Sequence, residues 1–169
     1  MIRNYYTDGA ATMRKIDGEY VREAGGWAFI LLDENMKELN RLNGGEEATT
    51  NNRMELMAIF MALNDAEYEA RFNEEPTIVN IYSDSAYCIN IFTQWIEGWI
   101  KRGWKKADKK PIENLDLIQR IWSKMNEITA HSFNTITFIK VKGHDNVHWN
   151  EEADKFAVAA KEAIQEGNK

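Results

Sequence analysis

Apolar and polar stretches alternate along the chain in a way that predicts alternating strands and helices. Compact apolar runs rich in β-branched and aromatic residues are typical of buried strands, and apolar residues spaced three and four apart are typical of helices. Strands are therefore expected over residues 2–7, 27–32, 36–42, 77–83 and 135–141. Helices are expected from Asn51 onward, within 85–104 as one or two short segments, over 115–125 and over 150–165. The polar stretch that follows Asp8, up to about Gly26, is interpreted as a loop.

This order of elements predicts an α/β fold with one mixed five-stranded sheet flanked by helices. The first three strands follow one another closely, so we expect them to form an antiparallel meander. A length of 169 residues suits one domain with a sizeable core. With only 2 prolines and 10 glycines, the composition argues against linkers. We therefore expect residues 1–169 to form a single domain.

The composition also bears on the compartment. No stretch approaches the ~20 apolar residues that span a bilayer, and the N-terminus lacks the long apolar core of a secretion signal. The single cysteine, Cys88, cannot form an internal disulfide. The expected location is the reducing cytoplasm, with no membrane partner.

Charge is unevenly distributed along the chain. The formal net charge is -6, from 27 acidic and 21 basic residues, which on average argues against a polyanionic partner. Residues 101–110, however, hold six basic residues and one acid, a local charge of +5 that leaves -11 on the rest. Tryptophans are interleaved with these charges, which favours a nucleic-acid surface over an ordinary solvated face.

Four separated carboxylates are the candidates for chemistry. Asp8 and Asp84 each close a predicted strand, where open α/β sheets place ligands. Either aspartate alone is better explained as a turn or cap residue, but this explanation weakens when both occur together. Glu55 lies early in the first predicted helix and Asp154 near the start of the last. Converging carboxylates need a cation, and oxygen-only ligands suit Mg²⁺ or Mn²⁺ rather than zinc. Two such ions about 4 Å apart can activate a water and stabilise the leaving oxygen of a phosphodiester.

Six segments extend this hypothesis from residue types to a family. They are YTDGA at 6–10, TTNNRMEL at 49–56, YSDS at 82–85, QWIEGWIKRGWK at 94–105, VKGH at 141–144 and NEEAD at 150–154. Their order and spacing closely resemble type 1 ribonuclease H, over nearly the whole chain from Tyr5 to about Ala160. The resemblance implies a ribonuclease H-like fold. It also implies an endoribonuclease that hydrolyses the RNA strand of RNA–DNA hybrids by two-metal-ion catalysis, leaving 5′-phosphate and 3′-hydroxyl ends.

The same resemblance assigns catalytic roles. Asp8, Glu55, Asp84 and Asp154 match the family's metal-binding carboxylates, which hold two Mg²⁺ ions, with Mn²⁺ a possible substitute. His144 matches a histidine that assists proton transfer or product departure, for which its ordinary pKa is suited. Without the motif, a lone histidine is more often structural.

Recognition of the hybrid duplex follows by the same comparison of motifs. Thr50 and Asn114 resemble a pocket for a DNA-strand phosphate, and Asn51 and Asn52 match residues that contact RNA 2′-hydroxyls, the group that distinguishes RNA from DNA. Thr50, Asn51 and Asn52 are also candidate caps for the Glu55 helix. The remaining matches are Tyr87 and Trp99, which line the channel for the DNA sugars, and the basic protrusion with Lys101, Arg102, Trp104, Lys105 and Lys106. A monomer is the default expectation.

Two segments depart from the family pattern. Residues 10–15 stand where the family commonly has a loop rich in glycine and proline, and they begin a longer charged excursion. Residues 145–149 lack the glycine that usually follows the histidine. Neither departure removes a candidate metal ligand.

Two other functions were weighed. A transposase, integrase or junction nuclease of the same fold would cut DNA, but such proteins usually carry extra domains that 169 residues barely allow. A hybrid-binding protein without catalysis is the other alternative, and the presence of all four carboxylates argues against it.

Overall fold

The protein is described here by a computed structural model, which covers residues 1–131, 133–142 and 148–167. Five strands form one mixed sheet in the order β3-β2-β1-β4-β5. Their bounds are β1 Ile2–Ile16, β2 Glu19–Leu32, β3 Glu38–Thr49, β4 Ile78–Ser83 and β5 Thr135–Lys140. β2 is antiparallel to both β1 and β3, whereas β4 runs parallel to β1 and β5 parallel to β4. The predicted fold class is confirmed.

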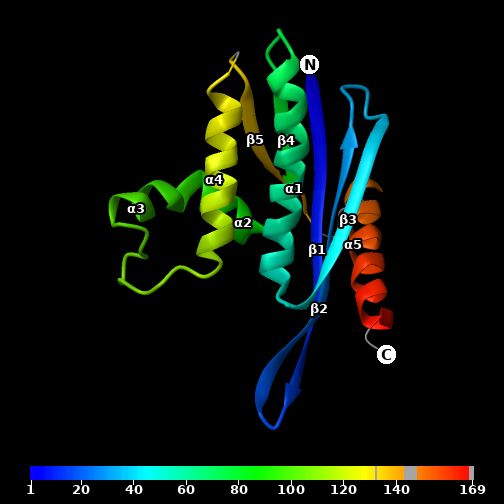
Figure 1. Cartoon of the computed structure of the whole chain (residues 1–169), viewed down its shortest axis with the longest axis vertical. Coiled ribbons are helices and arrows are strands. Elements are labelled where there is room, and N and C mark those ends of the chain that lie inside the picture. Colours follow the sequence, from blue (N-terminus) through cyan, green and yellow to red (C-terminus); the bar gives the residue numbers. More distant parts are fainter. Residues whose placement is uncertain (132, 143–147, 168–169) are drawn as a thin grey trace.

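Helices cover both faces of this sheet. They are α1 Asn51–Phe72, α2 Ala86–Asn90, the π-helical segment η1 Ile91–Trp95, α3 Ile96–Lys101, α4 Leu115–Thr129 and α5 His148–Gly167. α1 packs on β1 with α4 beside it, and α5 covers β1 and β2 on the opposite face (Figure 1). Within the described ranges, every helix is too short or too polar to cross a membrane.

The sequence prediction was wrong for the segment after Asp8, which is not a loop but two paired strands. β1 and β2 continue past the body of the sheet as a two-stranded hairpin, which we call the hairpin arm, residues 11–24 (Figure 1). Asp17 and Gly18 both have positive φ, +52° and +86°, as a two-residue type I′ turn requires. Residues 13–22 are all exposed, so the arm has no buried face and lacks the apolar alternation by which strands are recognised.

Candidate active site

Asp8 and Asp84 come together because β1 and β4 are parallel and in register. Tyr6 pairs with Tyr82 at the last pairing of the two strands, so each aspartate lies two residues beyond a paired position. The Thr7 hydroxyl donates to the Tyr82 carbonyl at 3.0 Å, which ties the two strands together at this end. The sheet therefore places the two carboxylates side by side, as the strand-end pattern predicts.

Glu55 reaches the same place through a close approach between α1 and β1. The helix begins where Thr50, its N-cap, accepts a hydrogen bond from the Arg53 amide at 3.2 Å, so Glu55 falls early in the helix. A Cβ at Gly9 would lie 2.4 Å from the Glu55 backbone nitrogen, closer than real atoms approach. Glycine next to Asp8 thus allows the helix to pass close enough for the two acids to meet.

The three carboxylates form a compact oxygen cluster. One oxygen from each of Asp8, Glu55 and Asp84 lies within 4.8 Å of the others. Asp8 and Glu55 are only 3% and 7% exposed. Among the described residues, the Oε2 atom of Glu55 is buried without a hydrogen-bond partner. Such an atom costs free energy unless a ligand absent from the chain itself satisfies it.

Burial and mutual repulsion shift the protonation of all three groups. Burial raises the pKa of Asp8 to about 7, and the negative charge of Asp84 adds to the rise. Burial, together with the charge of Asp8, holds the pKa of Glu55 well above its usual range. The pKa of Asp84 is also raised, by burial and by the charge of Asp154. A cation at this cluster would lower these pKa values, because it would attract the charged carboxylates and offset their mutual repulsion.

A polar pocket lies beside the start of α1. It has a volume of about 350 Å³, and its lining residues are Met13, Arg22, Thr50, Asn51, Asn52, Glu113 and Asn114. The side-chain oxygen of Asn51 accepts from the Ala11 amide at 2.7 Å, which fixes the base of the hairpin arm to the helix. The pocket therefore brings together the predicted phosphate and 2′-hydroxyl contacts.

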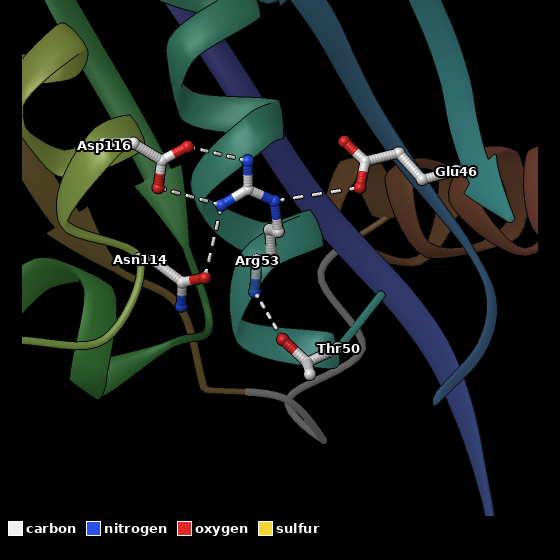
Figure 2. A network of polar contacts seen from close by, with 5 residues as sticks. All are labelled: Glu46, Thr50, Arg53, Asn114 and Asp116. Carbon is white, nitrogen blue, oxygen red and sulfur yellow. Dashed lines mark hydrogen bonds and ion pairs between the residues drawn. The ribbon is translucent and has the colours of Figure 1, made fainter. Parts of the chain in front are cut away.

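Arg53 contacts Asn114 of this pocket and joins several elements beside it, a role that the sequence prediction did not include. Its guanidinium binds both carboxylate oxygens of Asp116 at 3.2 and 3.0 Å and reaches the Asn114 oxygen at 3.4 Å (Figure 2). Its Nε atom lies 3.7 Å from the Glu46 carboxylate on β3. Arg53 also lowers the pKa of Asp116 by this hydrogen bonding. The network joins α1 to the loop before α4, where Asn114 adopts a left-handed backbone with φ +57°.

A second groove, of about 470 Å³, lies among aromatic and basic side chains. Its lining residues are Tyr87, Trp95, Trp99, Arg102, Lys106, Ala107 and Asp108. The rings of Trp95 and Trp99 are 6.0 Å apart, and Tyr87 lies 6.1 Å from Trp95. Trp95 is a further residue that the sequence analysis did not single out. Lys101 and Lys105 are exposed outside the groove lining, and Trp104 is half-buried against the core.

Comparison with known proteins agrees with this architecture. The family model for RNase H matches residues 3–162. The chain belongs to the ribonuclease H family. Among curated relatives, the ribonuclease H of Chlorobaculum parvum is 40% identical over 153 residues, covering 90% of each chain. That of Cupriavidus metallidurans is 44% identical over 133 residues, covering 79% of this chain and 81% of the relative.

A solved structure supports the fold independently. LC11-RNase H1, crystallised in complex with RNA/DNA hybrid, superposes with a TM-score of 0.62. It is 19% identical, and the match covers 96% of this chain and 99% of that one. At this identity the comparison concerns the ribonuclease H fold alone.

The carboxylate cluster fits the divalent cation on which ribonucleases H depend. Its donors are all oxygens, two of its members are buried, and the orphaned Glu55 oxygen faces no partner among the described residues. Mg²⁺ and Mn²⁺ prefer such ligands. Asp8, Glu55 and Asp84 could therefore bind a metal ion.

Asp154 and His144 are the other two predicted catalytic residues. Asp154 is exposed on α5 and outside the tight group. Hydrogen bonding with Asp154 contributes to the raised pKa of Asp8, and the charge of Asp154 contributes to the raised pKa of Asp84, so Asp154 borders the same site. His144 lies outside the described residues.

Proposed function

We propose that the chain is an endonuclease that hydrolyses the RNA strand of RNA–DNA hybrids by two-metal-ion catalysis, leaving 5′-phosphate and 3′-hydroxyl ends. Membership of the ribonuclease H family supports ribonuclease action on such hybrids. The observation that carries the mechanism is the cluster of Asp8, Glu55 and Asp84, whose oxygens lie within 4.8 Å of one another.

In this proposal the acids divide the work of holding two Mg²⁺ ions, with Mn²⁺ a possible substitute. By the family resemblance, Asp8 would help to hold both ions, Glu55 and Asp84 would complete one site, and Asp154 would complete the other. Ions held by these residues would supply an activated water and would offset the negative charge of the phosphodiester. His144 is proposed to assist proton transfer or product departure.

We propose that the polar pocket at the start of α1 and the aromatic groove each bind a different part of the hybrid duplex. Thr50 and Asn114 would bind a DNA-strand phosphate in the pocket, with Asn51 and Asn52 on the RNA 2′-hydroxyls. Tyr87 and Trp99 would line the path of the DNA sugars, beside the basic residues Lys101, Arg102, Lys105 and Lys106 and the ring of Trp104. This proposal is supported by the grouping of these residues, and by the relative of the same fold that was crystallised with an RNA/DNA hybrid.

The proposal needs one copy of the chain as a single catalytic domain. One sheet carries Asp8 and Asp84, and helices packed on its two faces carry Glu55 and Asp154. A monomer is therefore sufficient. The lone buried thiol, Cys88, is compatible with the proposed cytoplasmic location.

A substrate comparison tests this function. The chain is incubated with Mg²⁺ and end-labelled RNA–DNA hybrid, RNA duplex or DNA duplex of one sequence. We expect internal cuts in the RNA strand of the hybrid alone. Cutting of the DNA duplex would favour the transposase-like alternative, and binding of the hybrid without cutting would favour a non-catalytic binding protein.

The basic protrusion gives a quantitative prediction. Lys105→Ala combined with Lys106→Ala should weaken hybrid binding and lower the magnitude of the slope of log K against log salt by about 1 to 2, since each phosphate contact contributes about 0.9. Lys37→Ala is the control, because Lys37 is an exposed lysine in the turn between β2 and β3. An unchanged slope in the double variant would remove the protrusion from the binding surface.

A further inference from the structure

The hairpin arm has no net charge, yet its charges are sorted by position. Residues 11–24 contain three basic residues, Arg14, Lys15 and Arg22, and three acids, Asp17, Glu19 and Glu23. From its composition alone, this segment would be interpreted as a solvent-exposed loop with no net charge. Strand pairing decides which of these charges share a face.

Cross-strand partners in an antiparallel pair project to the same side, and sides alternate along each strand. Met13 pairs with Arg22 and Lys15 with Tyr20, so these four share one face, which we call the basic face. Arg14 pairs with Val21 and Ile16 with Glu19 on the opposite face. The basic face thus holds two cations and no acid.

The two faces also differ in how their cations are engaged. Arg14 on the opposite face forms an ion pair with Glu23, with 2.6 Å between Nε and Oε1. Within the described part of the chain, neither Lys15 nor Arg22 forms an ion pair. The Lys15 ammonium lies 5.7 Å from the centre of the Tyr20 ring. A phosphate backbone would meet two uncompensated charges on the basic face.

The basic face continues directly from the pocket at the start of α1. Met13 and Arg22 line that pocket together with Thr50, Asn52 and Asn114. Lys15 and Tyr20 lie one pair further along the same face, about 7 Å farther out at the usual rise per residue. The outer part of the arm projects from the end of the molecule where α1 and α4 begin (Figure 1), and its base contacts α1 through Asn51 and α5 through Lys161.

We propose that the basic face of the hairpin arm, formed by Met13, Lys15, Tyr20 and Arg22, is a nucleic-acid contact surface that binds the sugar-phosphate backbone of the duplex beyond the pocket. Arg22 binds a phosphate at the pocket rim, and Lys15 binds one farther out. The Tyr20 ring and the Met13 thioether supply apolar contact with the sugars. This inference rests on the proposed function and adds an anchoring element to it, one built from strands rather than from the 101–110 segment.

The chemistry selects a polyanionic backbone as the occupant. Both cations are exposed, so binding a phosphate releases counterions at little desolvation cost. The acids Glu19 and Glu23 belong to the opposite side of the arm, where they do not oppose that contact. The arm is attached to α1 through Asn51, and α1 carries Glu55 of the acidic cluster. Contacts between the arm and the duplex would therefore help to fix the position of the duplex relative to that cluster.

A pair of matched variants tests the proposal. Arg22→Gln and Arg14→Gln each remove one positive charge from the arm, on opposite faces, and Lys15→Gln/Arg22→Gln removes both cations of the basic face. Hybrid affinity is measured in EDTA, so that the RNA is not cut, across a salt series. The Lys15→Gln/Arg22→Gln variant should bind about 3- to 10-fold more weakly and lose about 1 to 2 from the magnitude of the salt slope. Arg22→Gln alone should lose about 1, and Arg14→Gln should leave the slope unchanged.

The outcomes separate this inference from the function beneath it. A wild-type slope in the Lys15→Gln/Arg22→Gln variant, or an equal loss of slope in Arg14→Gln, would overturn the inference while hybrid cutting by the wild type still stands. A wild-type chain that neither binds nor cuts the hybrid would overturn the proposed function and this inference together.

Discussion

Replacing Asp84 with asparagine is expected to lower the rate of RNA cleavage in an RNA–DNA hybrid by at least about 10³-fold, which corresponds to roughly 4 kcal/mol of barrier. Asparagine keeps the shape of the side chain but loses a ligand charge that the cluster of Asp8, Glu55 and Asp84 would offer to a metal ion. The fold should be retained, because removing one charge relieves repulsion among buried acids. Single-turnover cleavage with Mg²⁺ measures the effect, and thermal melting checks the fold.

Asp33→Asn is a matched control for this variant. Asp33 lies at the turn after β2, where its Oδ1 atom accepts from the Asn35 and Lys37 amides, and asparagine keeps that acceptor. The control should cut at the wild-type rate. Near-normal cleavage by Asp84→Asn would contradict the assignment of Asp84 to the metal site.

The second large effect concerns stability without metal. Burial raises the pKa of Asp8 from an ordinary value of 3.8 to about 7, so the folded state binds this proton more tightly than the unfolded state. The stability from that proton is fully present below about pH 4 and is lost as pH rises toward 7. We therefore expect this proton's contribution to the melting temperature of the metal-free protein to decrease as the pH rises from about 4 to about 7. Mg²⁺ should restore stability at pH 8, because it binds the folded state.

Asp8→Asn isolates this effect. The variant should melt higher than the wild type at pH 8 in EDTA, by on the order of 2 kcal/mol or about 4–8 °C for a chain of this size. It should also gain less from added Mg²⁺. Calorimetric melting at several pH values measures both, with Asp33→Asn as the control. A variant that melts lower than the wild type at pH 8 would contradict the buried, repelling cluster.

Much of the site was predictable because its geometry follows from strand order. Asp8 and Asp84 follow the apolar runs that identify β1 and β4, and the parallel register of these strands makes the two aspartates neighbours, although β1 itself continues past Asp8. Glu55 needed more than spacing, because its approach depends on Gly9 letting α1 pass close to β1. Periodicity places a glutamate early in a helix but does not show what that helix touches.

The hairpin arm was not predicted because strand recognition relies on one buried face. Residues 13–22 are exposed on both faces, so no apolar alternation marks them as strand. The pair Asp17-Gly18, the usual sequence of a type I′ turn, was the available signal. The Asp17-Gly18 pair indicates a hairpin turn only if the polar residues on either side of it are taken to form paired strands.

Arg53 and Trp95 were missed for different physical reasons. Arg53 lies within a segment that was already identified, but its partners Asn114 and Asp116 are some sixty residues away in the chain. Trp95 ends the π-helical segment η1, whose wider turn shifts the phase of the side chains. Spacing rules based on a regular α-helix therefore misplace it.

The distribution of charge explains how an acidic chain suits a polyanionic partner. The total of -6 conceals the +5 of residues 101–110. It also conceals the two cations of the basic face on an arm with no net charge. Part of the acidic excess is the cluster of Asp8, Glu55 and Asp84. Positive charge is concentrated in two places that are proposed to contact the duplex, residues 101–110 and the basic face of the hairpin arm.

The chemical nature of the cut ends tests the central claim most directly. RNA from an RNA–DNA hybrid cut by the wild-type chain is analysed for its terminal groups, with Mg²⁺ and with EDTA. Attack by a metal-activated water predicts 5′-phosphate and 3′-hydroxyl ends, and no cutting in EDTA. Ends bearing a 2′,3′-cyclic phosphate, or cutting that persists in EDTA, would contradict a metal-dependent reaction at Asp8, Glu55 and Asp84.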